Sequence, residues 1–169
     1  MPRIKLFFIV GILALALAAC GSGTDPVEGN LAPDFALKDL SGEMVNLSDY
    51  AGHPVLINFW ATWCAPCELE MPAIETRFEK YSPNLIVLAV NFDEPEELVQ
   101  EFVDKLSLTF EVLMDHDGTV QNLYMVRGYP TSIFVDTEGV IQKIHIGIMS
   151  EQQIDEYLAL IGLGQVAQK

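Results

Sequence analysis

Two cysteines separated by two residues, Cys64 and Cys67, are the side chains of this sequence best suited to chemistry. They lie in the segment FWATWCAPC (59–67). Their spacing allows the two sulfurs to close a small disulfide ring or to open to a dithiol. We expect a helix to begin at about Cys64, where unpaired N–H groups and the helix dipole stabilise a thiolate. Pro66 fits the first turn of such a helix, because its missing N–H costs little there. The motif therefore predicts thiol–disulfide exchange.

A structural disulfide and half of a metal site are two other interpretations of the same pair. A metal site needs two further soft ligands, but the three histidines are scattered along the chain, at His53, His116 and His145. The sequence contains three cysteines and the third is Cys20, so a four-cysteine zinc site is excluded. We predict no metal and no cofactor other than the redox-active disulfide of the pair itself.

Short apolar runs and helical patterns alternate around the cysteine pair. The run VLINF (55–59) directly before it is typical of a buried central strand. A helix is predicted over 64–81, with Leu69, Ile74 and Phe78 on one side. The other predicted elements are a hairpin over 34–40 and 44–47, strands over 85–90, 110–114, 131–135 and 140–146, and helices over 93–106, 118–124 and 151–161.

The order of these elements predicts the fold class. A hairpin comes first, strands and helices then alternate, and two strands with a closing helix follow. Alternation in the middle gives parallel strands with crossover helices, and the last two strands add an antiparallel edge. We therefore predict an α/β fold with a central mixed β-sheet flanked by helices.

Three features together resemble the thioredoxin superfamily: WCAPC after a buried strand, GYPT (128–131) before another buried strand, and the order of elements. The resemblance is closer to the membrane-tethered TlpA/ResA branch of thiol-disulfide oxidoreductases, and it covers residues 31–162. It implies a thioredoxin fold with an N-terminal β-hairpin. The helix and strand near 95–114 match the extra βα insertion of that branch.

The resemblance also implies roles for individual residues. Cys64 is expected to be the exposed nucleophile and Cys67 the resolving thiol. Pro130 is expected to be a cis-proline facing the disulfide, beside a Tyr129 backbone that pairs with an extended substrate segment. The substrate surface implied by the resemblance comprises Trp63, Ala65, Pro66, Tyr129 and Pro130.

One departure from thioredoxin concerns a carboxylate. Thioredoxins have a buried aspartate where this sequence has Asn58, which cannot accept a proton. In the ResA-like pattern an acid in a VN-x-x-E segment lies near the cysteines, and Glu94 is the matching position. We therefore expect Glu94 to relay the proton of Cys67, with helix capping as the alternative.

A second departure is Glu68 and Glu70, which follow the pair where thioredoxins often have a lysine. Treated as charges partly screened by solvent, they destabilise the thiolates modestly. A less stable thiolate goes with a more reducing pair, so the sequence predicts a reductant.

Charge and the N-terminus predict the setting of the protein. With 24 acidic and 9 basic residues the formal charge is −15, which excludes binding to nucleic-acid phosphates. Arg3 and Lys5 precede an apolar run over 6–19 that is too short to span a membrane, as in a signal peptide. The run ends in LAAC, which resembles the bacterial lipobox, so we expect cleavage before Cys20 and lipid on its sulfur; an uncleaved anchor is the alternative.

The predicted domain organisation is a signal peptide over 1–19, a flexible tether over 20–30, rich in Gly, Ser, Asp and Pro, and a thioredoxin-like domain over 31–169. The tether is expected to hold this domain off the bilayer, outside the cytoplasm, where disulfides persist.

These observations predict a reductant of protein disulfides. By resemblance, its substrates include the CxxCH cysteines of apocytochromes c, and its electrons come from a membrane donor of the CcdA/DsbD type. The alternatives are an oxidase or isomerase of secreted proteins, a peroxiredoxin-like peroxidase and a copper-delivery module. The peroxidase motif Pro-x-x-x-Thr-x-x-Cys is missing before Cys64, and a copper module would space its cysteines by three and place a histidine in a late loop.

Overall fold

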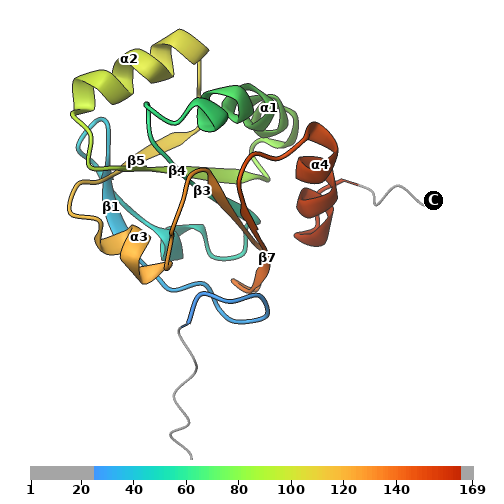
Figure 1. Ribbon diagram of the computed structural model, residues 1–169. Helices are drawn as coiled ribbons and strands as arrows, with labels where there is room; N and C mark the ends of the chain where they lie inside the picture. Colours follow the sequence, from blue (N-terminus) through green and yellow to red (C-terminus); the bar gives the residue numbers. More distant parts are fainter. Residues whose placement is uncertain (1–24, 165–169) are drawn as a thin grey trace, which may run out of the picture.

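The computed structural model describes residues 25–164, so the predicted signal segment and Cys20 lie outside the described residues. A single sheet of seven strands forms the centre (Figure 1). Its strands are β1 (Ala36–Asp39), β2 (Met44–Asn46), β3 (Val55–Trp60), β4 (Ile86–Phe92), β5 (Glu111–Asp115), β6 (Thr131–Val135) and β7 (Ile141–Ile146). All seven correspond to predicted strands.

The order across the sheet is β2-β1-β5-β4-β3-β6-β7. The central pairs β3–β4 and β4–β5 are parallel, whereas β6 and β7 on one side and β1 and β2 on the other are antiparallel to their neighbours. The predicted mixed sheet with an antiparallel edge is confirmed. The N-terminal hairpin adds a second antiparallel edge, because β1 pairs with β5.

Helices cover both faces of the sheet (Figure 1). On one face lie α1 (Ala65–Tyr81), α2 (Glu96–Leu106) and α4 (Glu151–Leu160), and on the other lie α3 (Thr119–Leu123) and the 3-10 helix η1 (Leu47–Tyr50). Each face has its own apolar core. Within residues 25–164, no helix is both long enough and apolar enough to cross a membrane.

Strand β3 is buried along its whole length and separates the two cores. Leu56 and Trp60 face α1, whereas Ile57 and Phe59 face the opposite side. Because side chains alternate along a strand, Asn58 faces the α1 side as well. This alternation places a polar side chain beneath the helix that bears the cysteines.

The predicted apolar face of α1 is partly wrong. Leu69 is 73% exposed, whereas Met71 and Ile74 are buried. Five residues of an α-helix turn through about 500°, so Leu69 and Ile74 lie about 140° apart around the axis. The face that packs on the sheet instead follows the spacing of Cys67, Met71 and Ile74.

The folded part also begins earlier than residue 31. The N–H of Gly29 donates to the carbonyl of Ile141, and Glu28 forms an ion pair with Lys143 at 2.8 Å. Residues 28–30 therefore pack against β7, in a stretch for which the sequence suggested a flexible tether.

Candidate functional site

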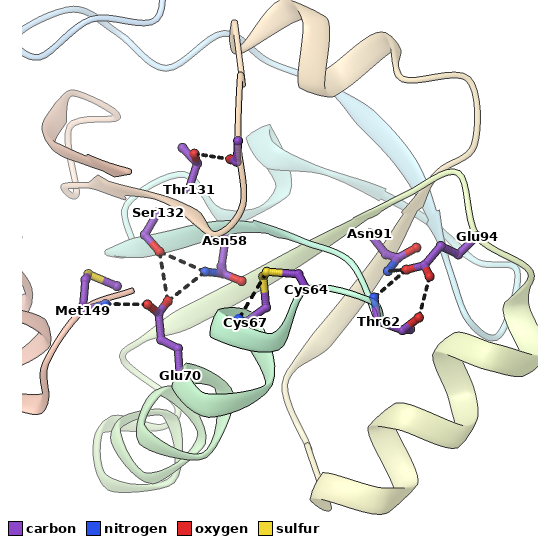
Figure 2. Close-up of a disulfide and its surroundings, with 11 residues drawn as sticks. Asn58, Thr62, Cys64, Cys67, Glu70, Asn91, Glu94, Thr131, Ser132 and Met149 are labelled. Atoms are coloured by element: carbon purple, nitrogen blue, oxygen red, sulfur yellow. Dashed lines mark hydrogen bonds between the residues drawn. A yellow bond between two sulfur atoms is a disulfide. The ribbon is translucent and has the colours of Figure 1, made fainter. Parts of the chain in front are cut away.

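A disulfide joins Cys64 and Cys67 at the beginning of α1, with an S–S distance of 2.09 Å (Figure 2). Cys64 is the N-cap of the helix, and its sulfur accepts the N–H of Cys67 at 3.2 Å. The sequence predicted an exposed nucleophile, but Cys64 is only 5% exposed and Cys67 1%. In the disulfide form both sulfurs are therefore shielded, and the N–H that reaches Cys64 is placed to stabilise a thiolate there.

Access to Cys64 is from a pocket of about 520 Å³. Four of the five residues predicted to contact substrate line it: Trp63, Ala65, Pro66 and Tyr129. The Trp63 side chain is 68% exposed, and its ring lies 5.7 Å from that of Tyr129. Cys67 does not line this pocket, so Cys64 is the sulfur that an incoming group meets first.

The fifth predicted residue, Pro130, is buried and follows a cis peptide bond, as the resemblance implies. The loop before it is held in place at two points. The Tyr129 hydroxyl donates to the side-chain oxygen of Gln121, and Thr131 donates to the carbonyl of Gly128 at 2.8 Å. Burial raises the pKa of Tyr129 to about 12, with the charges of Asp115 and Glu94 adding to the effect, so the hydroxyl stays protonated as a donor.

The main functional residue that the sequence analysis misjudged is Glu70. The sequence predicts a charge partly screened by solvent at this position, but Glu70 is 2% exposed and its side chain points from α1 toward Asn58 and Ser132 of the sheet (Figure 2). Its Oε1 accepts hydrogen bonds from Asn58 Nδ2 at 3.2 Å and Ser132 Oγ at 3.5 Å, and its Oε2 accepts the N–H of Met149 at 2.7 Å. Burial raises the pKa of Glu70 to about 7, although these three hydrogen bonds oppose the rise.

A carboxylate from α1 thus occupies the region where thioredoxins place a strand aspartate. Glu70 follows Cys67 by three residues, so both lie on the side of the helix that faces β3. Two signals in the sequence point to this arrangement. Asn58 in a buried strand needs a hydrogen-bond partner, and position 70 shares the helix face of Cys67 and Ile74.

Glu94 is buried on the other side of the disulfide from Glu70 (Figure 2). Its carboxylate accepts the N–H of Thr62 at 2.7 Å, the Thr62 hydroxyl at 2.5 Å and Asn91 Nδ2 at 2.8 Å. It does not cap α2, which begins at Glu96 with Pro95 as N-cap and no side-chain hydrogen bond. These contacts hold the loop that leads from β3 to Cys64.

Within residues 25–164, Glu94 forms no hydrogen bond to either sulfur. The predicted proton relay from Cys67 to Glu94 therefore has no direct hydrogen-bonded route in the disulfide form. The helix that bears the pair has two buried carboxyls, Glu70 and Glu75, and Glu70 is the nearer to the pair in sequence. The companion charge Glu68 is half-exposed and pairs with Lys105 at 2.5 Å, which weakens its effect on the pair.

Residues able to hold a metal are not gathered at this site. In the described part of the chain, no group of three or more His, Cys, Asp or Glu side chains is arranged to bind an ion. His145 packs against Tyr157, with ring centroids 5.7 Å apart. The chemistry that the arrangement supports is exchange at the disulfide, with an acid–base group of near-neutral pKa beneath it.

Comparisons with known proteins agree with this geometry. The family model described as AhpC/TSA family matches residues 29–144. The thioredoxin-like protein YneN of Bacillus subtilis is 47% identical over 136 residues, covering 79% of each chain. The thiol-disulfide oxidoreductase ResA of Halalkalibacterium halodurans is 41% identical over 134 residues, covering 79% of this chain and 76% of that protein. A crystal structure is known of a Chlorobium tepidum protein that is provisionally assigned as the thiol:disulfide interchange protein DsbE. That protein is 34% identical to this chain. It superposes with a TM-score of 0.75 over 80% of this chain and 99% of that one.

Proposed function

Because the chain belongs to the AhpC/TSA family and is a thiol-disulfide oxidoreductase of the ResA type, we propose that it reduces protein disulfides outside the cytoplasm. The observation that favours reduction is the buried Glu70 carboxyl, whose pKa of about 7 leaves it partly charged at neutral pH. A negative charge beneath the pair destabilises the thiolate of reduced Cys67. Strong oxidants depend on a stabilised reduced form, so this arrangement favours a reducing pair.

The proposed reaction begins with the reduced protein. The Cys64 thiolate attacks one sulfur of a substrate disulfide, the substrate S–S bond breaks, and the released sulfur takes a proton. Cys67 then loses its proton, for which Glu70 is the proposed acceptor, although among the described residues Glu70 forms no hydrogen bond to either sulfur in the disulfide form. The Cys67 thiolate attacks Cys64, and the second substrate sulfur leaves as a thiolate that takes a proton. Two electrons have passed to the substrate, and Cys64 and Cys67 are left as the disulfide seen in the structure.

The N-terminal sequence and the family resemblance support the proposed setting. Cleavage before Cys20 and lipid on its sulfur would anchor the protein to a membrane outside the cytoplasm. Apart from Cys64 and Cys67 the chain has only Cys20, so a partner must return the electrons; a membrane donor of the CcdA/DsbD type fits this need. The proposed substrates are proteins such as apocytochromes c with oxidised CxxCH cysteines.

A peroxiredoxin-like peroxidase is an alternative raised by the sequence, but the residues here do not fit that activity. With Cys64 as the peroxidatic cysteine, the motif Pro-x-x-x-Thr-x-x-Cys requires Pro at position 57 and Thr at position 61, where this chain has Ile57 and Ala61. We therefore propose disulfide exchange rather than peroxide reduction.

The reduction potential of the pair tests the proposed direction. It is measured by equilibrating protein carrying Cys20→Ala with a glutathione or dithiothreitol series. A value near or below about −250 mV supports a reductant, whereas about −120 to −180 mV would place the protein among oxidants and isomerases. Absence of a reversible two-electron couple would overturn the redox function itself.

A further inference from the structure

We propose that the pocket beside Cys64 selects substrates with a carboxylate near their disulfide, and that Arg127 binds this carboxylate. The inference rests on the proposed function, since it names a property of the substrate that Cys64 attacks. It concerns the substrate-facing side of the site, opposite to the buried network around Glu70.

The charge of the pocket differs from that of the whole protein. The chain has a formal charge of −15, yet among residues 25–164 no acidic side chain lines this pocket. Arg127 is the one charged residue among the lining residues, which also include Trp63, Gln121 and Tyr129. Among the described residues, the lining of the pocket next to Cys64 therefore carries one positive and no negative side chain, in a strongly acidic protein.

Arg127 is also free to bind a substrate. Several other basic side chains are engaged in ion pairs: Arg77 with Glu151 and Asp155, Lys105 with Glu68, and Lys143 with Glu28. Over residues 25–164, Arg127 forms neither an ion pair nor a side-chain hydrogen bond. An unpaired guanidinium presents a planar set of donors that matches a carboxylate with two parallel hydrogen bonds.

The backbone around Arg127 is fixed rather than loosely attached. The fully buried Asp115 carboxylate accepts the N–H groups of Val120 and Gln121, which anchors α3. The N–H of Val126 donates to the carbonyl of Gln121 at 2.9 Å, and the Gln121 side chain binds the Tyr129 hydroxyl. Arg127 therefore lies in a short loop that is tied to α3 and to the residue before Pro130.

This arrangement has a consequence for substrate choice. An acidic protein repels acidic substrates in general, so such a substrate needs a local positive group to approach Cys64. Arg127 supplies it next to the aromatic pair Trp63–Tyr129, against which the substrate backbone can pack. We expect an aspartate or glutamate close to the reactive cysteine to increase the exchange rate and a lysine to decrease it.

The test uses synthetic peptides with one intramolecular Cys-x-x-Cys disulfide. A Gln at each position flanking the first cysteine is replaced in turn by Glu or Lys, and the second-order rate of reduction by the reduced protein is measured at low and high salt. At the position where the effect is largest, we expect the Glu peptide to react about threefold to fivefold faster than the Gln peptide, which is the size of effect that an exposed ion pair gives. High salt should reduce this difference in rate.

Variants assign the preference to a residue. Arg127→Gln is expected to abolish it, Arg127→Glu to transfer it to the Lys peptide, and Arg127→Lys to retain part of it. Lys38→Gln removes the same charge from β1, whose residues do not line the pocket, and should leave the preference intact. Thermal unfolding of each variant checks that it is folded.

Equal rates for the Glu, Gln and Lys peptides would overturn the inference, as would an equal loss in Lys38→Gln and Arg127→Gln. The same peptides in their dithiol form, mixed with oxidised protein, separate this inference from the proposed direction. If only this reverse reaction occurs, the protein is not a reductant, yet the charge preference is still measured. If neither reaction occurs, both proposals are wrong.

Discussion

Replacing Glu70 by Gln is expected to change how the stability of the oxidised protein depends on pH. Folding raises the pKa of Glu70 from 4.5 to about 7, mainly because the carboxyl is buried. The folded protein therefore holds the Glu70 proton more tightly than the unfolded chain does. The stabilisation is fully present below pH 4.5 and is lost as the pH rises through about 7.

The size of the effect follows from the same values. At about 1.4 kcal/mol per pH unit, a pKa raised from 4.5 to about 7 corresponds to roughly 3 kcal/mol of unfolding free energy. Gln cannot titrate, so the Glu70→Gln variant should lack this loss. The difference in unfolding free energy between wild type and variant should then change by roughly 3 kcal/mol between pH 4.5 and 8.

The surroundings of position 70 can accept the amide of Gln. The Oδ1 of Asn58 is buried and has no hydrogen-bond partner among the described residues. If the Asn58 amide turns over, this oxygen can accept from the new Gln Nε2, while the Gln oxygen keeps the N–H of Met149. The variant should therefore be well folded at neutral pH.

Urea unfolding at a series of pH values between 4.5 and 8 measures the difference directly. Glu68→Gln is the matched control, because it removes a carboxylate two residues away that is half-exposed and paired with Lys105. Parallel curves for wild type and Glu70→Gln would refute the reasoning. The reasoning would also be refuted if the unfolding free energy of Glu68→Gln changed with pH in the same way as that of Glu70→Gln.

Three further predictions concern the redox chemistry and the loop before Cys64. Glu70→Gln should make the pair less reducing by about 30 mV at pH 8 and by little at pH 6, where Glu70 is mostly protonated; glutathione titrations at both pH values measure this. Cys67→Ser should accumulate a mixed disulfide with substrate and Cys64→Ser should not, as seen on non-reducing gels; the opposite pattern would reverse the assignment of the two cysteines. Glu94→Ala should cost about 2 kcal/mol of stability, because it leaves the buried Asn91 Nδ2 and the part-buried donors of Thr62 without an acceptor. If Glu94 only positions the loop, Glu94→Gln should exchange disulfides nearly as fast as wild type and faster than Glu94→Ala. If Glu94 relays a proton, Glu94→Gln should exchange as slowly as Glu94→Ala.

The fold was predictable because its central elements have strong local signals. The run VLINF became β3, buried on both faces, and the Cys-x-x-Cys motif began α1 with Cys64 as N-cap. The hairpins were marked by turn residues such as those at 136–139. Each of these signals depends on residues close together in the sequence.

The roles of the acidic residues were not predictable in the same way, because burial of a charge depends on contacts between distant segments. Glu70 is buried by residues 12, 62 and 79 positions away, namely Asn58, Ser132 and Met149. Glu94 reaches Thr62, 32 positions away, instead of capping the helix that follows it. The error at Leu69 was of another kind, since counting residues around the helix would have placed it in solvent.

Two charged groups around the disulfide, Arg127 and Glu70, affect two different properties, substrate choice and reduction potential. A single charged group beside the disulfide would affect both together. A cation beside Cys64 stabilises its thiolate and makes a pair more oxidising, which opposes reduction of substrates. Arg127 is exposed, so solvent screens its effect on the sulfur while it can still form two short hydrogen bonds with a docked carboxylate. Glu70 is buried, so its charge acts on the pair with little screening. Substrate choice and reduction potential can therefore be changed independently, by substitution at Arg127 and at Glu70.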